Sequence, residues 1–450
     1  MFLEYDAAVF SRMLTGLTLG FHIIFATIGV GVPLMIAFAE WMGIRKNDEH
    51  YRLLARRWAR GFVVTVAVGV VTGTSIGLQL NLLWPNFMQL AGQTISLPLF
   101  MEVFAFFFEA IFFGIYLYTW DRFKSRTRHL LLMIPIVIGA SFSAFFITSV
   151  NSFMNAPRGF ELTNGVITDI NPLAAMFNPA APTKTAHVLV TCYLTSAFVL
   201  GMIGAVKMLK GDRHVYHKKA LQLTMTAAFV FSIGTVGIGD LSGKYLAEYQ
   251  PEKLAAGEWH FQTQTEAPLV VGGVLTEDNE VQYALEVPYA LSILAHGTPS
   301  AEVIGLEEFP KENRPPLIVH YFFDSMVTIG IYLAFVPLLY LFLRWKKPDW
   351  MHHKVLLSGI AVGGPLSILA TELGWVYAEV GRQPWILHGI MRTPEGATTS
   401  SHVDAMLYLF LGLYAVLGIS SAVVLRKMFK NNPVAHELES RGIDRRGGSS

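Results

Sequence analysis

The stretch LLLMIPIVIGASFSAFFITSV, residues 130–150, decides the fold class, because none of its twenty-one consecutive residues is charged. A helix needs about 20 such residues to cross the ~30 Å hydrocarbon layer of a membrane. Comparable apolar runs occur on both sides of it, so the sequence predicts an all-α integral membrane protein, a bundle of nine transmembrane helices. The predicted spans are residues 12–40, 61–84, 97–119, 130–150, 185–208, 221–246, 317–344, 355–380 and 403–427.

The composition of the 450-residue chain agrees with a lipid environment. Apolar residues make up 53% of the chain and charged residues 15%, whereas roughly 25% of an average globular protein is charged. The formal net charge of +1 excludes a general electrostatic attraction to nucleic acid. Cys192 is the single cysteine, so disulfide frameworks and cysteine-based zinc or iron–sulfur sites are also excluded.

Basic residues follow every second span, and this alternation predicts the orientation of the chain. They are Arg45, Lys46, Arg52, Arg56, Arg57 and Arg60 after the first span, Arg122, Lys124, Arg126 and Arg128 after the third, Lys207, Lys210, Arg213, Lys218 and Lys219 after the fifth, Arg344, Lys346, Lys347 and Lys354 after the seventh, and Arg426, Lys427 and Lys430 after the ninth. Because cytoplasmic loops are enriched in Lys and Arg, we expect the N-terminus outside and the C-terminus in the cytoplasm. Residues 1–246 would hold six helices, 247–316 an extracytoplasmic loop, 317–430 three helices, and 431–450 a disordered cytoplasmic tail.

Several ionisable side chains lie inside the predicted spans, where they are costly and usually serve a function. His22, Glu102, His187 and Glu379 are all expected in the outer half of the membrane, with Met326 on the same side. Taken singly, Met326 is best explained by core packing, and His22 and His187 are explained by core packing about as well as by a function. Together, histidine and methionine in an apolar, cysteine-free interior are typical axial ligands of heme iron, so heme is the leading cofactor.

Two further pairs of charged residues are candidates for proton and substrate chemistry. Glu102 and Glu109 are seven residues apart and therefore share one face of a helix. Carboxylates stacked within a bundle can relay protons, although hydrogen bonds between helices are an alternative explanation. Lys253 and Glu258 lie in the long loop, where their charges alone would indicate a solvated surface.

Three motifs resemble subunit I of cytochrome bd quinol oxidases. They are GWVYAEVGRQPW at residues 374–385, FFFEAIFFGIYLYTWDRF at 106–123, and QPEKLAAGE at 250–258. Their order, with nine spans and a long loop before the seventh span, extends the resemblance over essentially the whole chain. The loop is of the shorter kind in this family.

The resemblance implies a role for each candidate residue. His187 and Met326 would be the axial ligands of a low-spin heme b, and His22 and Glu379 the proximal ligands of a high-spin heme b and a heme d. Which of the last two binds which heme stays open, with His22 favoured for heme b. The remaining roles are proton delivery near the high-spin hemes for Glu102, Glu109 and Glu372, quinol binding for Lys253 and Glu258, and flanking of the hemes for Arg382, Gln383 and Trp385.

The implied protein is a subunit of a respiratory oxidase in the bacterial cytoplasmic membrane. It would oxidise quinol at the outer face and reduce O2 to water, generating proton motive force by charge separation without a pump. Its cofactors would be two hemes b (one low-spin, one high-spin) and one heme d. Its partners would be a second membrane subunit and a very small third one, with quinol and O2 as substrates.

One position departs from the family pattern, since many relatives have Arg two residues before the methionine ligand and this chain has Asp324. An acidic side chain could not neutralise a heme propionate, so we expect it to face elsewhere or to be protonated.

Two other functions remain open at this level. A cytochrome b-like, quinone-reactive electron-transfer subunit would carry only b-type hemes, and a proton-coupled transporter would carry none. A visible spectrum of the purified protein separates these alternatives from the oxidase.

Overall fold

The computed structural model describes residues 5–276 and 279–442 and is mostly helical. In these two stretches, nine helices are long and apolar enough to cross a membrane, which confirms the prediction. They are α1 (Ala7–Arg45), α2 (Glu49–Leu83), α3 (Pro85–Tyr118), α5 (Met133–Asn155), α7 (Ala181–Leu209), α8 (Val215–Tyr249), α11 (Val319–Lys346), α12 (Lys354–Val380) and α14 (Val403–Asn431).

Most of these helices extend beyond the predicted spans. The helix α2, for example, starts at Glu49 rather than at residue 61, and its first turns carry Arg52, Arg56 and Arg57. A hydropathy pattern detects only the part of a helix that lies in hydrocarbon, whereas the backbone hydrogen bonds continue into the polar interface.

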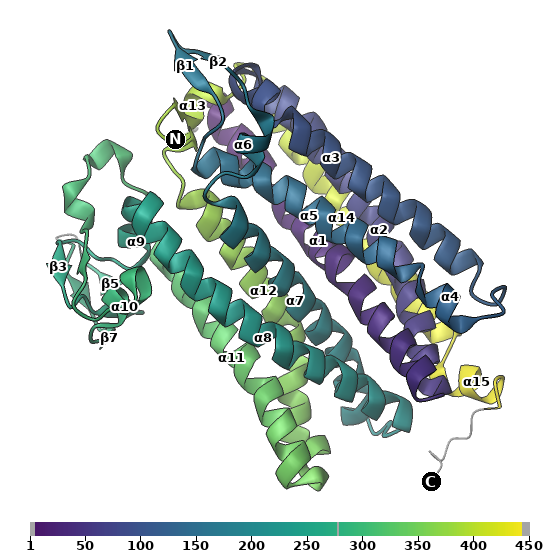
Figure 1. Ribbon diagram of the computed structural model, residues 1–450. Coiled ribbons are helices and arrows are strands. Elements are labelled where there is room, and N and C mark those ends of the chain that lie inside the picture. Colours follow the sequence, from purple (N-terminus) through teal and green to yellow (C-terminus); the bar gives the residue numbers. More distant parts are fainter. Residues whose placement is uncertain (1–4, 277–278, 443–450) are drawn as a thin grey trace.

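The nine helices form two connected groups (Figure 1). In the first, α1 packs on α2, α3 packs on α5, and α14 packs on α1 and α2; in the second, α7, α8, α11 and α12 pack on one another. The helices α1 and α5 contact α7 and join the groups. The helices α1 and α7 approach closely at Gly31 of α1, where an added Cβ would collide with Ser196 Oγ of α7, so only glycine permits this crossing.

The connections between the long helices contain short elements only. The short helices are α4 (Arg126–Leu130), α6 (Pro172–Met176), α9 (Pro251–Gly257), α10 (Ala290–His296), α13 (Thr393–Gly396) and α15 (Val434–Glu439), with 3-10 turns η1 (Leu306–Glu308), η2 (Lys311–Asn313) and η3 (Pro348–His352). The antiparallel ribbons pair β1 (Glu161–Thr163) with β2 (Val166–Thr168), β3 (Gln264–Thr265) with β8 (Glu302–Val303), β4 (Leu269–Val271) with β7 (Leu285–Val287), β5 (Val274–Leu275) with β6 (Val281–Gln282), and β9 (Trp385–Leu387) with β10 (Met391–Arg392).

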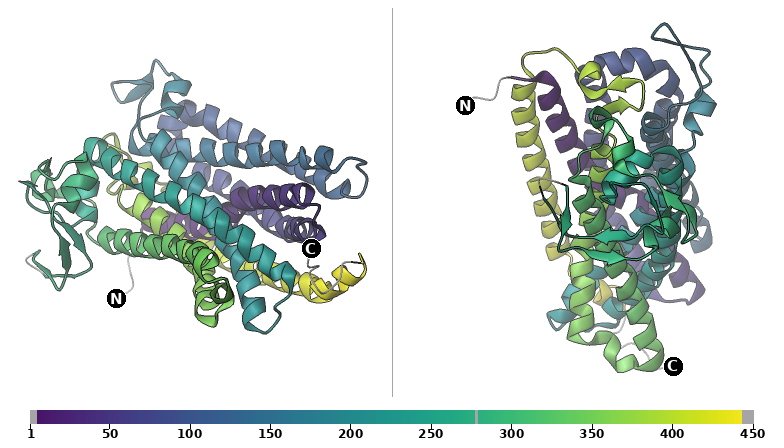
Figure 2. Two further views of the ribbon diagram at one scale, coloured as in Figure 1. Left: turned by 60° about the horizontal axis from the view of Figure 1, so that its bottom comes forward. Right: turned by 90° about the vertical axis from the view of Figure 1, so that its left-hand side faces the viewer.

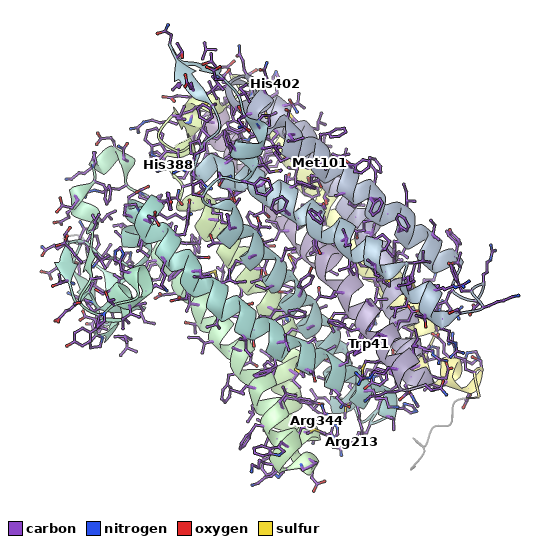
Figure 3. The ribbon with its side chains drawn as sticks, in the orientation of Figure 1. Trp41, Met101, Arg213, Arg344, His388 and His402 are labelled. Carbon is purple, nitrogen blue, oxygen red and sulfur yellow. The ribbon has the colours of Figure 1, made fainter. Side chains whose placement is uncertain are left out.

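The long loop between α8 and α11, residues 250–318, projects from one end of the bundle, which we call the loop end (Figure 2). The helix α1 begins at the loop end, and α14 finishes at the opposite end (Figure 1). Arg213 and Arg344, which the basic-residue pattern places on one side of the membrane, both lie at the opposite end, while His388 lies at the loop end (Figure 3).

The prediction of a disordered C-terminal tail is wrong for its first part. Residues 434–439 form α15, whose Leu438 side chain is fully buried. Glu437 forms ion pairs with Arg57 and Arg60 of α2. The apolar contact and the two charge pairs fold this segment back onto the bundle; residues 443–450 lie outside the described part of the chain.

Candidate functional site

His187 and Met326 face the interior of the four-helix group at the loop end. Their helices, α7 and α11, each pack against both α8 and α12 and are therefore diagonal to each other. His187 is six residues from the start of α7 and Met326 seven from the start of α11, which is ~9 and ~10 Å at 1.5 Å per residue. Both helices start at the loop end, so the two side chains lie at the same depth.

Glycines stand beside both of these side chains. A Cβ added to Gly374 of α12 would lie 3.0 Å from Met326 Sδ, and one added to Gly239 of α8 would lie 3.7 Å from His187 Cε1. Among the described residues, the buried His187 Nδ1 has no hydrogen-bond partner. An unpartnered imidazole nitrogen, a thioether and small neighbouring residues fit a flat metal macrocycle held by histidine and methionine.

The second histidine, His22 of α1, is held by α2. Its Nδ1 lies 2.8 Å from Thr72 Oγ1. A hydrogen bond to one ring nitrogen orients a histidine whose other nitrogen can bind a metal. The ring packs closely on Gly73, since a Cβ added there would lie 3.3 Å from His22 Cε1.

Glu379, near the end of α12, is the centre of a charged cluster. Its carboxylate accepts hydrogen bonds from Arg382 Nη2 at 2.7 Å and from Asn151 Nδ2 of α5. Lys184 Nζ of α7 donates to Asn151 Oδ1 at 3.3 Å, and Lys253 Nζ donates to Ala378 O at 3.1 Å. The Arg382 and Asn151 donors hold the Glu379 carboxylate in a fixed position at the end of α12.

This cluster contains more positive than negative charge. Lys184, Lys253 and Arg382 lie around the Glu379 carboxylate, and Glu252 is a second carboxylate near Lys253. Arg382 is 7% exposed, and its buried Nε and Nη1 find no acceptor within the described residues. Buried donors in excess of acceptors indicate an anionic group between them, and the carboxylate arms of a heme are such a group. The residues present therefore fit heme.

The carboxylates of α3 face α5, as their shared helix face predicts. Glu102 accepts a hydrogen bond from Ser143 Oγ at 3.1 Å. Glu109 is buried, and a Cβ added to Gly139 of α5 would lie 3.0 Å from its backbone nitrogen. Glu372 of α12 lies elsewhere: its Oε2 is 3.6 Å from the Cβ that Gly20 of α1 lacks. Glu372 therefore packs against α1.

Gln383 and Trp385 stabilise the turn after α12. Gln383 accepts from Thr393 Oγ1 at 2.8 Å, and the Trp385 ring packs 5.0 Å from the Arg392 guanidinium. The hydrogen bonds and the cation–π contact of these two side chains lie within residues 379–393, so they act on the position of Glu379 and Arg382.

Lys253 and Glu258 are buried, with 2% and 1% of their surface exposed, so they are not the solvated charges that their types alone would indicate. Burial lowers the pKa of Lys253 to about 8. Burial, with a smaller effect of the Asp324 carboxylate, raises the pKa of Glu258 to about 8. Neither Glu258 oxygen has a hydrogen-bond partner in the described part of the chain.

Asp324 faces the loop, as the family departure predicts. Its Oδ2 accepts from the backbone nitrogen of Gly272 and lies 3.2 Å from His320 Nε2. This carboxylate is therefore engaged by the loop and by a histidine of its own helix.

Sequence reasoning missed four residues that the structure brings into these sites: Lys184, Asn151, Thr72 and His320. Lys184 lies one position before the predicted span 185–208, and Asn151 and Thr72 are neutral, so a search for charges inside spans passes over them. The spacing of His320 and Asp324, four apart on one helix face, was the one signal available for His320.

Comparison with known sequences gives a consistent result. The sequence profile of cytochrome bd terminal oxidase subunit I matches residues 10–433. A Bacillus subtilis (strain 168) protein provisionally named cytochrome bd menaquinol oxidase subunit I is 40% identical over 448 residues, which cover 97% of this chain and 99% of that protein. Cytochrome bd-II ubiquinol oxidase subunit 1 of Escherichia coli (strain K12) is 26% identical over 510 residues, covering 97% of this chain and 98% of that protein.

A solved structure agrees. The structure of bd oxidase from Geobacillus thermodenitrificans is similar with a TM-score of 0.92 and 65% identity, covering 95% of this chain and 99% of that chain. These matches favour an oxidase over the cytochrome b-like subunit and the transporter. The protein is a multi-pass bacterial membrane protein whose family carries heme. This chain belongs to the cytochrome bd terminal oxidase subunit I family and is a subunit of a terminal respiratory oxidase.

Proposed function

We propose that this chain oxidises quinol at its loop end and delivers the electrons to O2 through two hemes b and one heme d. His187 and Met326 hold the low-spin heme b, His22 the high-spin heme b, and Glu379 the heme d. The observation that carries the proposal is the diagonal placement of His187 and Met326 at one depth, with Gly374 and Gly239 beside them.

The ligand sets explain a division of labour. When bound, the hemes supply electron transfer and, where an axial position is open, binding of O2. His187 and Met326 would both hold one heme, which would limit their site to electron transfer. His22 and Glu379 would each supply a single ligand, which would leave room for O2 at those sites.

Quinol oxidation releases two protons and two electrons, and two quinols reduce one O2 to two waters with four protons. Glu258 is the residue that accepts a quinol proton, since its carboxyl is buried and has no hydrogen-bond partner in the described structure. Lys253 holds α9 against α12 through Ala378 O, and a Cβ on Gly381 would lie 2.7 Å from Lys253 Cε. The relatives are named for menaquinol and for ubiquinol, so we assign the substrate as a quinol.

We assign the loop end to the outer face of the membrane, following the basic residues at the opposite end. Quinol protons then leave outward, while protons for water come from the cytoplasm, so charge separates without a pump. Glu109 and Glu102 form the part of the proton route nearest the high-spin hemes. A second membrane subunit, to which a subunit I binds, would supply the rest, with a very small third subunit in the complex.

The visible spectrum of the purified complex tests the cofactor assignment. We expect Soret and alpha bands of b-type heme together with a red-shifted chlorin band of heme d. Bands of b-type heme alone would reduce the assignment to an electron-transfer subunit, and the absence of any bound tetrapyrrole would contradict it.

Replacing Glu258 by glutamine should reduce quinol-dependent O2 consumption about 100-fold, the lower end of the usual contribution of a positioned base. A base must be ionised to accept a proton. Because the pKa of Glu258 is raised to about 8, the wild-type rate should rise as the pH increases through about 8. This rise of the rate with pH should be absent in Glu258→Gln.

The matched control is Glu252→Gln at the other end of α9, whose carboxylate binds His388 Nε2 at 2.8 Å. The rate of Glu252→Gln should still rise as the pH increases through about 8. Heme spectra should be unchanged in both variants, and an unaltered quinol rate and pH profile in Glu258→Gln would remove Glu258 from the mechanism.

A further inference from the structure

His320, the second residue of α11, is completely buried, and its ring nitrogens face only acceptors within the described structure. Nδ1 lies 2.8 Å from Gly257 O, and Nε2 lies 3.1 Å from Gly272 O. The Asp324 carboxylate is 3.2 Å from the same Nε2.

Both ring nitrogens of His320 thus lie within hydrogen-bond distance of loop carbonyls, and Asp324 lies beside Nε2. The Trp259 ring stacks on His320 with 3.9 Å between centroids and 19° between planes, which fixes the plane of the imidazole. Trp259 Nε1 donates to Leu317 O at 2.9 Å, so the stacked ring is itself held in place.

The two carbonyls that His320 binds are fifteen residues apart in the loop, at positions 257 and 272. Gly257 directly precedes Glu258. The hydrogen bond between His320 Nδ1 and Gly257 O therefore fixes the position of the Glu258 backbone. Gly272 is bound twice, through its carbonyl to His320 and through its nitrogen to Asp324. One ring thus ties both ends of the segment 257–272 to the first turns of α11.

We propose that His320 is a positioning residue for quinol oxidation, acting as a clamp that holds Glu258 at the quinol site. This rests on the proposed role of Glu258. Asp324 is part of the clamp, which gives a reason for an acidic residue where many relatives have arginine.

The test compares quinol kinetics of His320→Gln, Asp324→Asn and the wild-type complex. Glutamine can bind one of the two carbonyls but not both. We expect the KM for quinol to rise about tenfold, the effect of one lost hydrogen bond, with kcat within about twofold because the electron-transfer sites remain. Hydrogen exchange at the amides of residues 257–272 should become faster.

The control is His260→Gln, a buried histidine of the same loop that binds one carbonyl, Val303 O at 3.0 Å. It should leave the KM for quinol unchanged. An equal rise of KM in His260→Gln would show a general loosening of the loop and overturn the clamp, as would an unchanged KM in His320→Gln.

Asp324→Asn provides the test if His320→Gln does not assemble with heme. An unchanged KM for quinol in Asp324→Asn also overturns the proposal. Glu258→Gln in the same assay separates two kinds of failure. Impaired quinol oxidation in Glu258→Gln with normal His320→Gln defeats only the clamp, whereas normal kinetics in Glu258→Gln defeats the quinol site itself.

Discussion

Met326→Ala is expected to remove the low-spin heme signal and to lower quinol-dependent O2 consumption by at least about 100-fold. The thioether is one of the two proposed axial ligands across the α7–α11 diagonal, and a methyl group cannot coordinate iron. His187→Ala should have the same effect from the opposite side. The reduced-minus-oxidised spectrum of the purified complex and its quinol oxidase rate measure both consequences.

Met202→Ala is the matched control for this experiment. Met202 of α7 also packs against a glycine of α12, since a Cβ on Gly364 would lie 2.6 Å from its sulfur. Met202→Ala removes the same type of side chain from the bundle and so loses a similar packing free energy, but Met202 is not a proposed iron ligand. Full low-spin heme in Met326→Ala, or an equal loss in Met202→Ala, would contradict the ligand assignment.

Glu379→Ala is expected to reduce O2 consumption by at least about 100-fold while the low-spin heme is still reduced by quinol. The variant loses the carboxylate between Arg382 and Asn151, and with it the proposed ligand of heme d. It also leaves Lys184, Lys253 and Arg382 without this counter-charge, which is costly in a buried site. The chlorin band of the spectrum and stopped-flow reduction by quinol report the two sites separately.

Glu395→Gln provides the comparison, because Glu395 lies at the same end and caps α13 through Arg392 N at 2.7 Å. Its spectrum and rate should match the wild type. If Glu379→Ala retained the chlorin band at full intensity, another side chain would have to hold that heme.

The number and order of the spanning helices could be predicted because both depend on local sequence. A helix of about 20 apolar residues matches the fixed thickness of the bilayer, and residues 130–150 form such a run. The ligand candidates were found in the same way, since His22, His187 and Glu379 are costly in lipid wherever the rest of the chain lies.

The environment of the loop residues could not be predicted in this way. Lys253 is buried because Ala378 and Gly381, more than a hundred residues away, lie beside it. The same holds for Glu258 and Asp324, whose surroundings are set by contacts between the loop and α11.

The sequence by itself determined the membrane spans and the set of costly side chains within them, because transfer of each residue into lipid is a local property. Only the tertiary structure decided that His187 and Met326 are diagonal, that Lys184 and Asn151 join Glu379, and that His320 binds two distant carbonyls. Each of these contacts joins two segments that are distant in the sequence. The free energy of such a contact depends on which groups meet after the helices have packed.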